Sequence, residues 1–155
     1  MSVSNLLVRR LAGAILGGVA IATVFSLLGY SDVGPTRSNY LRELAIALAS
    51  YLVAAFIVEW LIKRDNAIFD TLFVSLLGSA LSFPVKLIFL EGRNGIPVYI
   101  AETARNGFLK PFVDLSFHAI SFVILATLLS LPFVAAGVGM CRFYAKKGMR
   151  TTARL

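Results

Sequence analysis

The sequence contains one cysteine, Cys141, and one histidine, His118, among 155 residues. A single cysteine excludes an internal disulfide, and these two residues are too few for the usual zinc, haem or iron–sulfur sites. The Walker loop, the G-x-S-x-G elbow, the H-E-x-x-H motif and the Rossmann glycines are also missing. We therefore expect no metal, no cofactor and no catalytic residues.

Charge is scarce as well. Only 15% of the residues are charged and 58% are hydrophobic, with a mean hydropathy of +0.82, whereas a soluble domain carries about 25% charged residues. Four apolar runs, residues 11–28, 44–62, 68–90 and 113–141, are each close to or above the ~20 residues that cross a bilayer. The sequence predicts an all-α, polytopic integral membrane protein. It would be a single domain, residues 1–155, folded as an antiparallel bundle of four transmembrane helices.

The basic residues are unevenly divided between the two sides of this predicted bundle. Nine fall on one side, including Arg9, Arg10 and the tail, residues 142–155, and six fall on the other. Because basic loops stay in the cytoplasm, we expect both termini to be cytoplasmic in a bacterial-type inner membrane. Arg9 and Arg10 followed by an apolar run also fit a cleaved signal peptide. The run continues to Leu28, which favours retention of the first span.

Small residues in the first span form a seam that permits close helix packing. Gly13 and Gly17 are four residues apart, as are Ala14 and Gly18, so each pair shares one helix face. This seam predicts tight contact within the bundle, or with a second copy or another membrane protein.

The predicted loops carry local signals for helix ends. Asp65 and Asn66 are candidates to cap the third span. In the second outer loop, Pro97 suits a helix start and Gly107 a helix end, which predicts a short amphipathic helix on the membrane surface. An ordinary loop with one helical turn is the alternative.

A polar stripe ending in a lysine runs along the third span. Its members are spaced four, four, three and four residues apart and share one helix face: Thr71, Ser75, Ser79, Ser82 and Lys86. A cation within hydrocarbon is costly, so Lys86 is expected to face a cavity, pair with an acid or reach the interface.

Residues of the fourth span extend this stripe into a candidate binding site. Asp114 and His118 share one helix face near its outer end. We expect Lys86, Ser82, Ser79, Ser75, Asp114 and His118 to line a polar cavity for an anionic group, such as a lipid phosphate or an organic anion. In the alternative, Lys86 reaches the interface, Asp114 favours the helix N-terminus and His118 bonds a nearby carbonyl.

The tail is basic and lacks acids. We expect Arg142, Lys146, Lys147 and Arg150 to contact anionic lipid, and we expect no nucleic acid because no recognition motif accompanies the charge. The favoured function is a non-catalytic accessory or scaffold subunit whose partner is another membrane protein or a second copy. A small carrier that handles lipids or anions at Lys86 is the alternative, and an enzyme acting on a lipid comes third.

Overall fold

The computed structural model describes residues 3–27, 37–62, 65–89, 101, 103–105, 107 and 109–152. Four long helices lie within this part of the chain, α1 (Val3–Leu27), α2 (Arg37–Leu61), α3 (Ala67–Phe89) and α5 (Leu109–Thr152). Each contains a stretch long and apolar enough to cross a membrane, namely Leu6–Leu27, Tyr40–Leu61, Ala67–Ile88 and Phe112–Tyr144. The predicted all-helical chain with four apolar helices is confirmed, and these stretches indicate an integral membrane protein.

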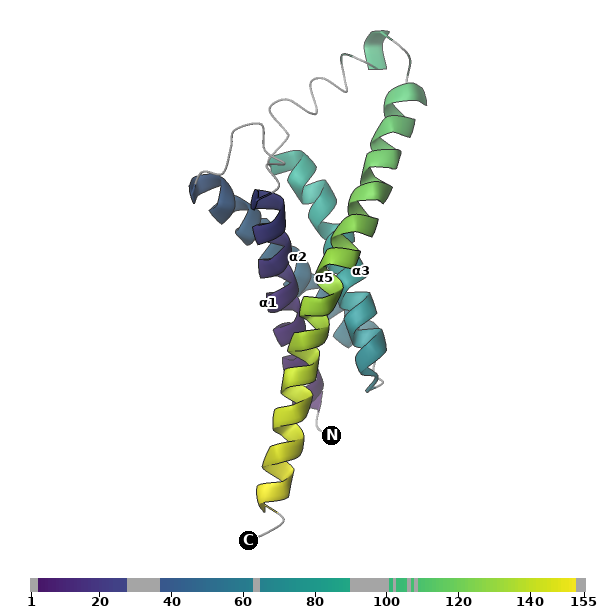
Figure 1. The fold of residues 1–155 in the computed structure, drawn as a ribbon. Coiled ribbons are helices and arrows are strands. Elements are labelled where there is room, and N and C mark those ends of the chain that lie inside the picture. The colour runs from purple at the N-terminus through teal and green to yellow at the C-terminus, as the bar shows by residue number, and fades with distance from the viewer. Residues whose placement is uncertain are drawn as a thin grey trace.

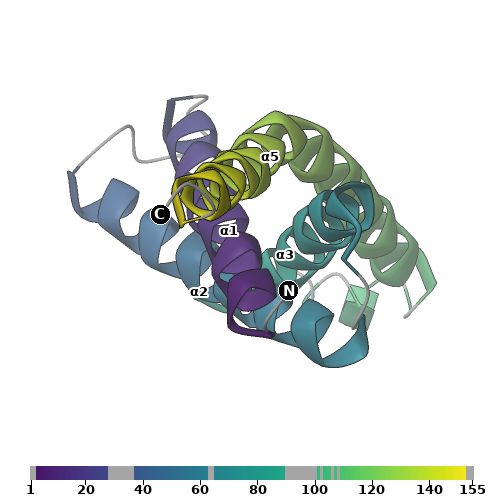
Figure 2. The same cartoon turned by 90° about the horizontal axis from the view of Figure 1, so that it is seen from below.

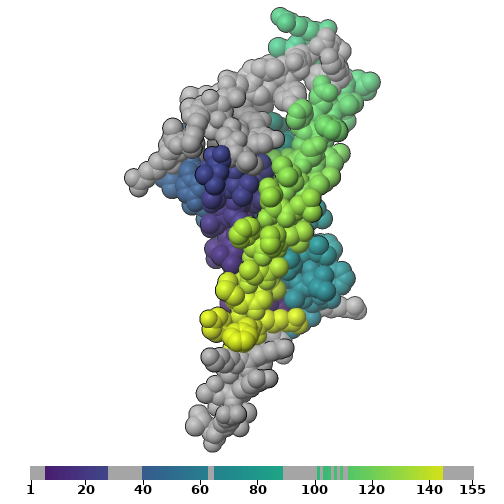
Figure 3. Space-filling view, viewed as in Figure 1, coloured from purple at the N-terminus to yellow at the C-terminus, as the bar shows by residue number. Residues whose placement is uncertain are grey.

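Consecutive helices run in opposite directions (Figure 1). As a result α1 begins and α5 ends at the same end of the molecule, which we name the terminal end, and the opposite end is the far end. Both α1 and α3 pack against α2 and against α5, and α1 and α3 also touch each other (Figure 2). In the space-filling view α5 runs along one face of the molecule (Figure 3).

The predicted seam of α1 lies against helices of the same chain. A Cβ at Gly17 would come within 2.5 Å of Val134 on α5 and 2.9 Å of Tyr51 on α2. A Cβ at Gly18 would lie 3.2 Å from the backbone of Leu48, and Ala14 is fully buried. The seam is therefore occupied by α2 and α5, and an oligomer could use it only if those helices moved away.

Tyr51 fills the space that these glycines leave at the centre of the structure. Its side chain is fully buried, and a Cβ at Gly78 on α3 would lie 2.7 Å from its ring. Its hydroxyl lies 3.0 Å from the Oγ of Ser79, which satisfies the polar end of a buried tyrosine. One residue of α2 thus packs against both α1 and α3.

The helix ends follow local sequence signals. The backbone N–H of Ile68 donates to Oδ1 of Asn66 at 3.0 Å, so Asn66 is confirmed as the cap of α3. Most of the predicted surface helix in the second outer loop lies outside the described residues. Gly107 has a positive φ of 77°, and its N–H donates to the carbonyl of Thr103 at 3.0 Å, as expected for a helix end.

Three helices are longer than the sequence predicts. The predicted first and second spans begin at residues 11 and 44, yet α1 begins at Val3 and α2 at Arg37, so both helices extend beyond their apolar runs to include charged residues. The 44 residues of α5 correspond to about 66 Å at ~1.5 Å per residue, roughly twice the hydrocarbon thickness. Both α3 and α5 continue as helices through their internal prolines, Pro84 and Pro132.

Candidate functional site

Lys86 lies in a largely buried cluster near the far end to which each of the four long helices contributes one residue. Its Nζ is 2.5 Å from Oε2 of Glu43 on α2. The same nitrogen lies 4.3 Å from the ring centre of Phe25 on α1 and 5.3 Å from that of Phe122 on α5. Of the three outcomes predicted for Lys86, pairing with an acid is the one observed. We name these four residues the lysine cluster.

The aromatic rings make the lysine cluster a closed environment for the ammonium group. Phe25 and Phe122 stack with their centres 5.1 Å apart, and Phe83 lies 5.5 Å from Phe122. A cation over aromatic faces is attracted by the ring quadrupole, most strongly when it is desolvated. Only 10% of the Lys86 side chain and 14% of the Glu43 side chain are exposed, so the pair is shielded from solvent.

Asp114 and His118 take a different position from the one that the sequence suggests. Phe122 is the α5 residue beside Lys86, and Asp114 precedes it by eight residues, about 12 Å along a helix. Asp114 and His118 are both exposed. Nδ1 of His118 lies 2.7 Å from the carbonyl oxygen of Asp114, the local contact that the alternative interpretation predicts. The proposed anion-binding role of these two residues stays a prediction.

The polar stripe of α3 is buried along its whole length. Ser79 contacts Tyr51, and the hydroxyl of Ser82 donates to the carbonyl of Ser79 at 2.9 Å. Ser79 therefore contacts α2, and Ser82 bonds to the backbone of its own helix. Serine hydroxyls that bond within the chain hold helices together, as polar groups do between membrane helices.

Removing one charge of the Lys86–Glu43 pair is expected to destabilise the protein. Glu43→Gln leaves a buried ammonium without its counter-ion, and we expect a loss of about 1.5–3 kcal/mol in the free energy of unfolding. Adding Lys86→Met to this variant removes the stranded charge, so the double variant should recover much of the loss. Unfolding curves of the three proteins in mild detergent measure this, and additive losses would contradict the pairing.

A second charged cluster lies at the terminal end and again draws on each of the four long helices. Its members form the arginine cluster: Arg9 and Arg10 of α1, Glu59 of α2, Asp65 of the α2–α3 turn, Asp70 of α3 and Arg142 of α5. Arg9, Arg10 and Asp70 are at most 1% exposed. The cluster is balanced, because three arginines face three carboxylates.

Asp70 is the centre of the arginine cluster. Its Oδ2 accepts a hydrogen bond from Arg9, and its Oδ1 accepts one from Nε of Arg10 at 2.8 Å. The other nitrogens of Arg10 reach Oε2 of Glu59 at 2.5 Å and the carbonyl of Ile62 at 2.7 Å. Arg10 therefore pairs with two acids and also satisfies a carbonyl at the C-terminal end of α2, where a cation is favourable.

The sequence gives only a weak signal for the arginine cluster. From the distribution of charge alone, Arg9 and Arg10 are expected only to set the orientation of the chain. The signal is the number of acids on the same side, since Glu59, Asp65 and Asp70 all lie at predicted span ends on that side. In the structure all three pair with Arg9 or Arg10.

Asp65 makes the stability of the protein depend on pH. Its hydrogen bond from Arg9 lowers the pKa of Asp65 below the ordinary value of 3.8, against the opposing effect of partial burial. A carboxyl group with a lowered pKa stabilises the fold fully above its ordinary pKa, and this stabilisation is lost as the pH falls through the folded-state pKa. We expect the protein to be more stable than Asp65→Asn at pH 7, by up to about 1 kcal/mol.

The difference in stability between the protein and Asp65→Asn should disappear well below pH 3.8, where the Asp65 carboxyl is protonated in both the folded and the unfolded state. Melting temperatures of the two proteins over this pH range measure it. A gap that stays constant down to the most acidic point would show that the Asp65 carboxylate is not the stabilising group.

The chemistry of the two clusters is that of internal pairing. Lys86 is matched by one acid, and Arg9 and Arg10 are matched by Glu59, Asp65 and Asp70. Arg142 is the exception, because its side chain is 43% exposed and lies 3.7 Å from Asp65. Paired and buried charges position helices and are poorly placed to attack or polarise a substrate. Comparison with known proteins found no matching family model, no matching curated protein and no matching solved structure.

Proposed function

We propose that this chain is a non-catalytic accessory or scaffold subunit that binds another membrane protein. The proposal places its four helices across a bacterial-type inner membrane as an antiparallel bundle, with the terminal end in the cytoplasm. The apolar stretches support insertion. The excess of basic residues at the terminal end supports the orientation.

The observation that carries the accessory role is the exposure of α5. Only 17% of its most apolar stretch is buried, compared with 50% for α1. Its first turns extend beyond the other three helices at the far end (Figure 1). A helix at the surface of a domain normally buries its apolar face and exposes the opposite, polar face. Here Phe112, Phe117, His118 and Ile120 are all exposed and together they cover most of the helix circumference.

The chemistry of this segment favours a protein helix as its partner. Phe117 and His118 lie edge to face with their ring centres 6.5 Å apart, beside the exposed Asp114. Lipid tails offer no hydrogen-bond partner to a histidine or a carboxylate, whereas polar side chains of a neighbouring helix do. Aromatic residues are also enriched where proteins meet. The proposed partner is therefore a transmembrane helix of another protein.

The carrier alternative has less support from the geometry. A substrate anion at Lys86 would have to displace Glu43 from a site enclosed by Phe25 and Phe122. An intact fold and intact cellular function after Lys86→Leu would discard this alternative.

Site-specific photo-crosslinking in native membranes tests the accessory role. A photoreactive residue at Phe117 or Ile124, both exposed, should give a defined adduct with one other membrane protein, and the same residue at the buried Val134 should not. Phe117→Ala should abolish co-purification of that protein without changing the melting temperature. Phe56→Ala on α2, also exposed, is the matched control and should retain the partner.

Two outcomes would contradict the proposal. Adducts only between copies of this chain would identify a homo-oligomer in place of a second protein. Adducts with lipid alone at every α5 position would mean that this helix simply faces the bilayer.

A further inference from the structure

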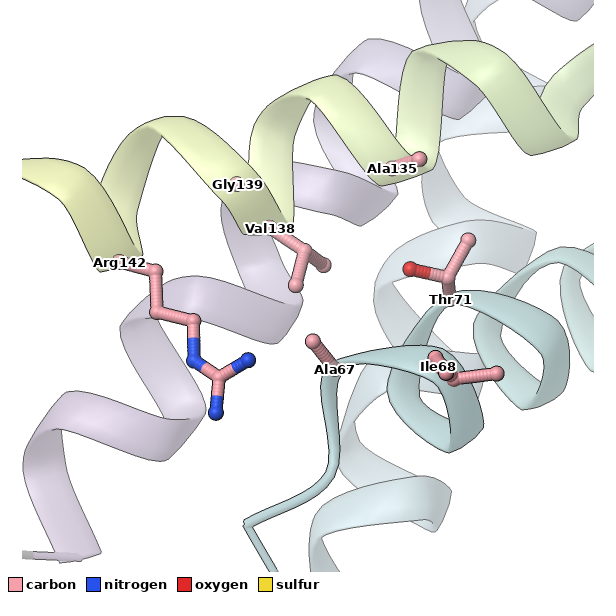
Figure 4. A pocket seen from close by; sticks show the side chains of 7 residues that line it. All are labelled: Ala67, Ile68, Thr71, Ala135, Val138, Gly139 and Arg142. Carbon is pink, nitrogen blue, oxygen red and sulfur yellow. The ribbon is translucent and has the colours of Figure 1, made fainter.

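A groove lies between α3 and α5 near the terminal end, with a volume of about 390 Å³. Its walls are apolar and come from Ala67 and Ile68 on α3 and from Ala135, Val138 and Gly139 on α5 (Figure 4). Thr71 and Arg142 complete its lining. Of the lysine and arginine clusters, only Arg142 contributes to the described lining of this groove.

The groove exists because its facing residues are small. A Cβ built on Gly139 would meet no atom within 4 Å, although a Cβ at Gly137, two residues earlier, would meet the α1 backbone at 2.7 Å. The helix α5 therefore packs closely on α1 through Gly137 and leaves open space on the side of Gly139. Ala135, one turn before Gly139, is also exposed.

Thr71 places a hydroxyl inside this groove. Its side chain is nine-tenths buried, and its oxygen points into the space between α3 and α5 (Figure 4). A hydroxyl can donate one hydrogen bond, so a ligand that places an acceptor at this point of the groove would gain a polar contact there.

Arg142 supplies a cation at the mouth of the groove. Its side chain is 43% exposed, and its nearest acid, Asp65, lies 3.7 Å away and bonds Arg9 at 2.6 Å. The guanidinium therefore keeps most of its donors for an external anion. Thr71 is one helical turn beyond Ala67, about 6 Å along α3, so its hydroxyl lies further from the terminal end of α3 than Ala67 does.

We propose that this groove binds one phospholipid with an anionic headgroup. Its phosphate would accept hydrogen bonds from Arg142, its ester carbonyl would accept one from Thr71, and an acyl chain would lie along the apolar walls. A phospholipid has this order of groups, with the phosphate at the surface, the ester below it and hydrocarbon below that. The proposal rests on the membrane location proposed above and is independent of the accessory role.

Lipid binding by the purified full-length protein in mild detergent tests this site. Native mass spectrometry should show one tightly bound phosphatidylglycerol, with weaker binding of phosphatidylcholine of the same acyl chains. Arg142→Gln should weaken phosphatidylglycerol binding about tenfold, the loss expected for one charge-assisted contact. It should weaken phosphatidylcholine binding less, because the choline group already neutralises the charge of that lipid's phosphate.

A variant that fills the groove gives a second test of the site, and a neighbouring variant serves as its control. Gly139→Leu should abolish tight binding of both lipids, because the added side chain occupies the open space. Ala136→Leu adds a bulky side chain at a neighbouring exposed position that does not line the groove, and should bind lipid normally. Equal melting temperatures of the two variants would exclude misfolding as the cause.

Three results would overturn the proposal. Tight lipid binding that survives Gly139→Leu would place the lipid elsewhere. Binding that falls equally after Arg142→Gln and after Lys146→Gln would indicate diffuse attraction to the tail. Glycerol phosphate binding as tightly as the lipid would exclude a role for the apolar walls. Because no partner protein is present, these results do not depend on the crosslinking outcome at Phe117.

Discussion

Replacing Asp70 with asparagine is expected to lower the free energy of unfolding by about 3 kcal/mol or more, the range found when one member of a buried ion pair is removed. Each carboxylate oxygen of Asp70 faces a different arginine, Arg9 on Oδ2 and Arg10 on Oδ1. In asparagine one of these oxygens becomes an NH₂ group, which places a donor against a donor. Two buried guanidinium groups then share less negative charge. Thermal and denaturant unfolding in mild detergent measure the loss.

Asp65→Asn is the control for the Asp70 prediction. Asp65 also accepts a hydrogen bond from Arg9, but its side chain is 29% exposed while that of Asp70 is fully buried. Solvent screens the partly exposed pair, so this control should lose no more than about 1 kcal/mol. Equal losses for the two variants would contradict the central role of Asp70.

A rescue experiment keeps the Asp70 prediction testable if the asparagine variant folds poorly. Adding Arg10→Gln removes one of the two positive charges that Asp70 balances. The loss in the double variant should be smaller than the sum of the two single losses, because the residues interact directly. Additive losses would mean that Arg10 and Asp70 do not stabilise each other.

The positions of the four helices could be predicted from composition because each span is a local property of about 20 residues. Pairing between distant charges is a different kind of information. Arg10 and Asp70 are 60 residues apart, and nothing in the local sequence around either one specifies the other. A count of basic residues therefore assigns Arg9 and Arg10 to a flank of α1, although they lie inside the helix and are buried.

The pairing of Lys86 can be predicted only in part from the sequence. The need for a counter-ion follows from the cost of a cation in hydrocarbon, and the sequence places Glu43 at the same membrane face. In the structure Phe122, eight residues after Asp114, is the α5 residue beside Lys86. The predicted span ends do not reveal this register of α5 against α3.

Substitution of Gly137 on α5 is the second change that we expect to lower the stability of the protein strongly. A Cβ at Gly137 would lie 2.7 Å from the carbonyl oxygen of Ala12 and 2.8 Å from Cα of Gly13, and these backbone atoms cannot rotate away. Gly137→Ala therefore forces α1 and α5 apart along a contact that also includes the buried side chains Val134 and Val138. Overpacking of this kind typically costs about 1–3 kcal/mol, and we expect a loss of stability in that range.

Gly139→Ala is the matched control, with the same chemical change two residues away on the same helix. Its added methyl group enters open space, and alanine is the better helix former by about 0.5–1 kcal/mol. This variant should be as stable as the natural protein or slightly more stable. Unfolding curves of both variants in mild detergent measure the difference. Equal destabilisation by the two substitutions would contradict the close contact between α1 and α5 at Gly137. It would also contradict the division of α5 into a packed side at Gly137 and an open side at Gly139.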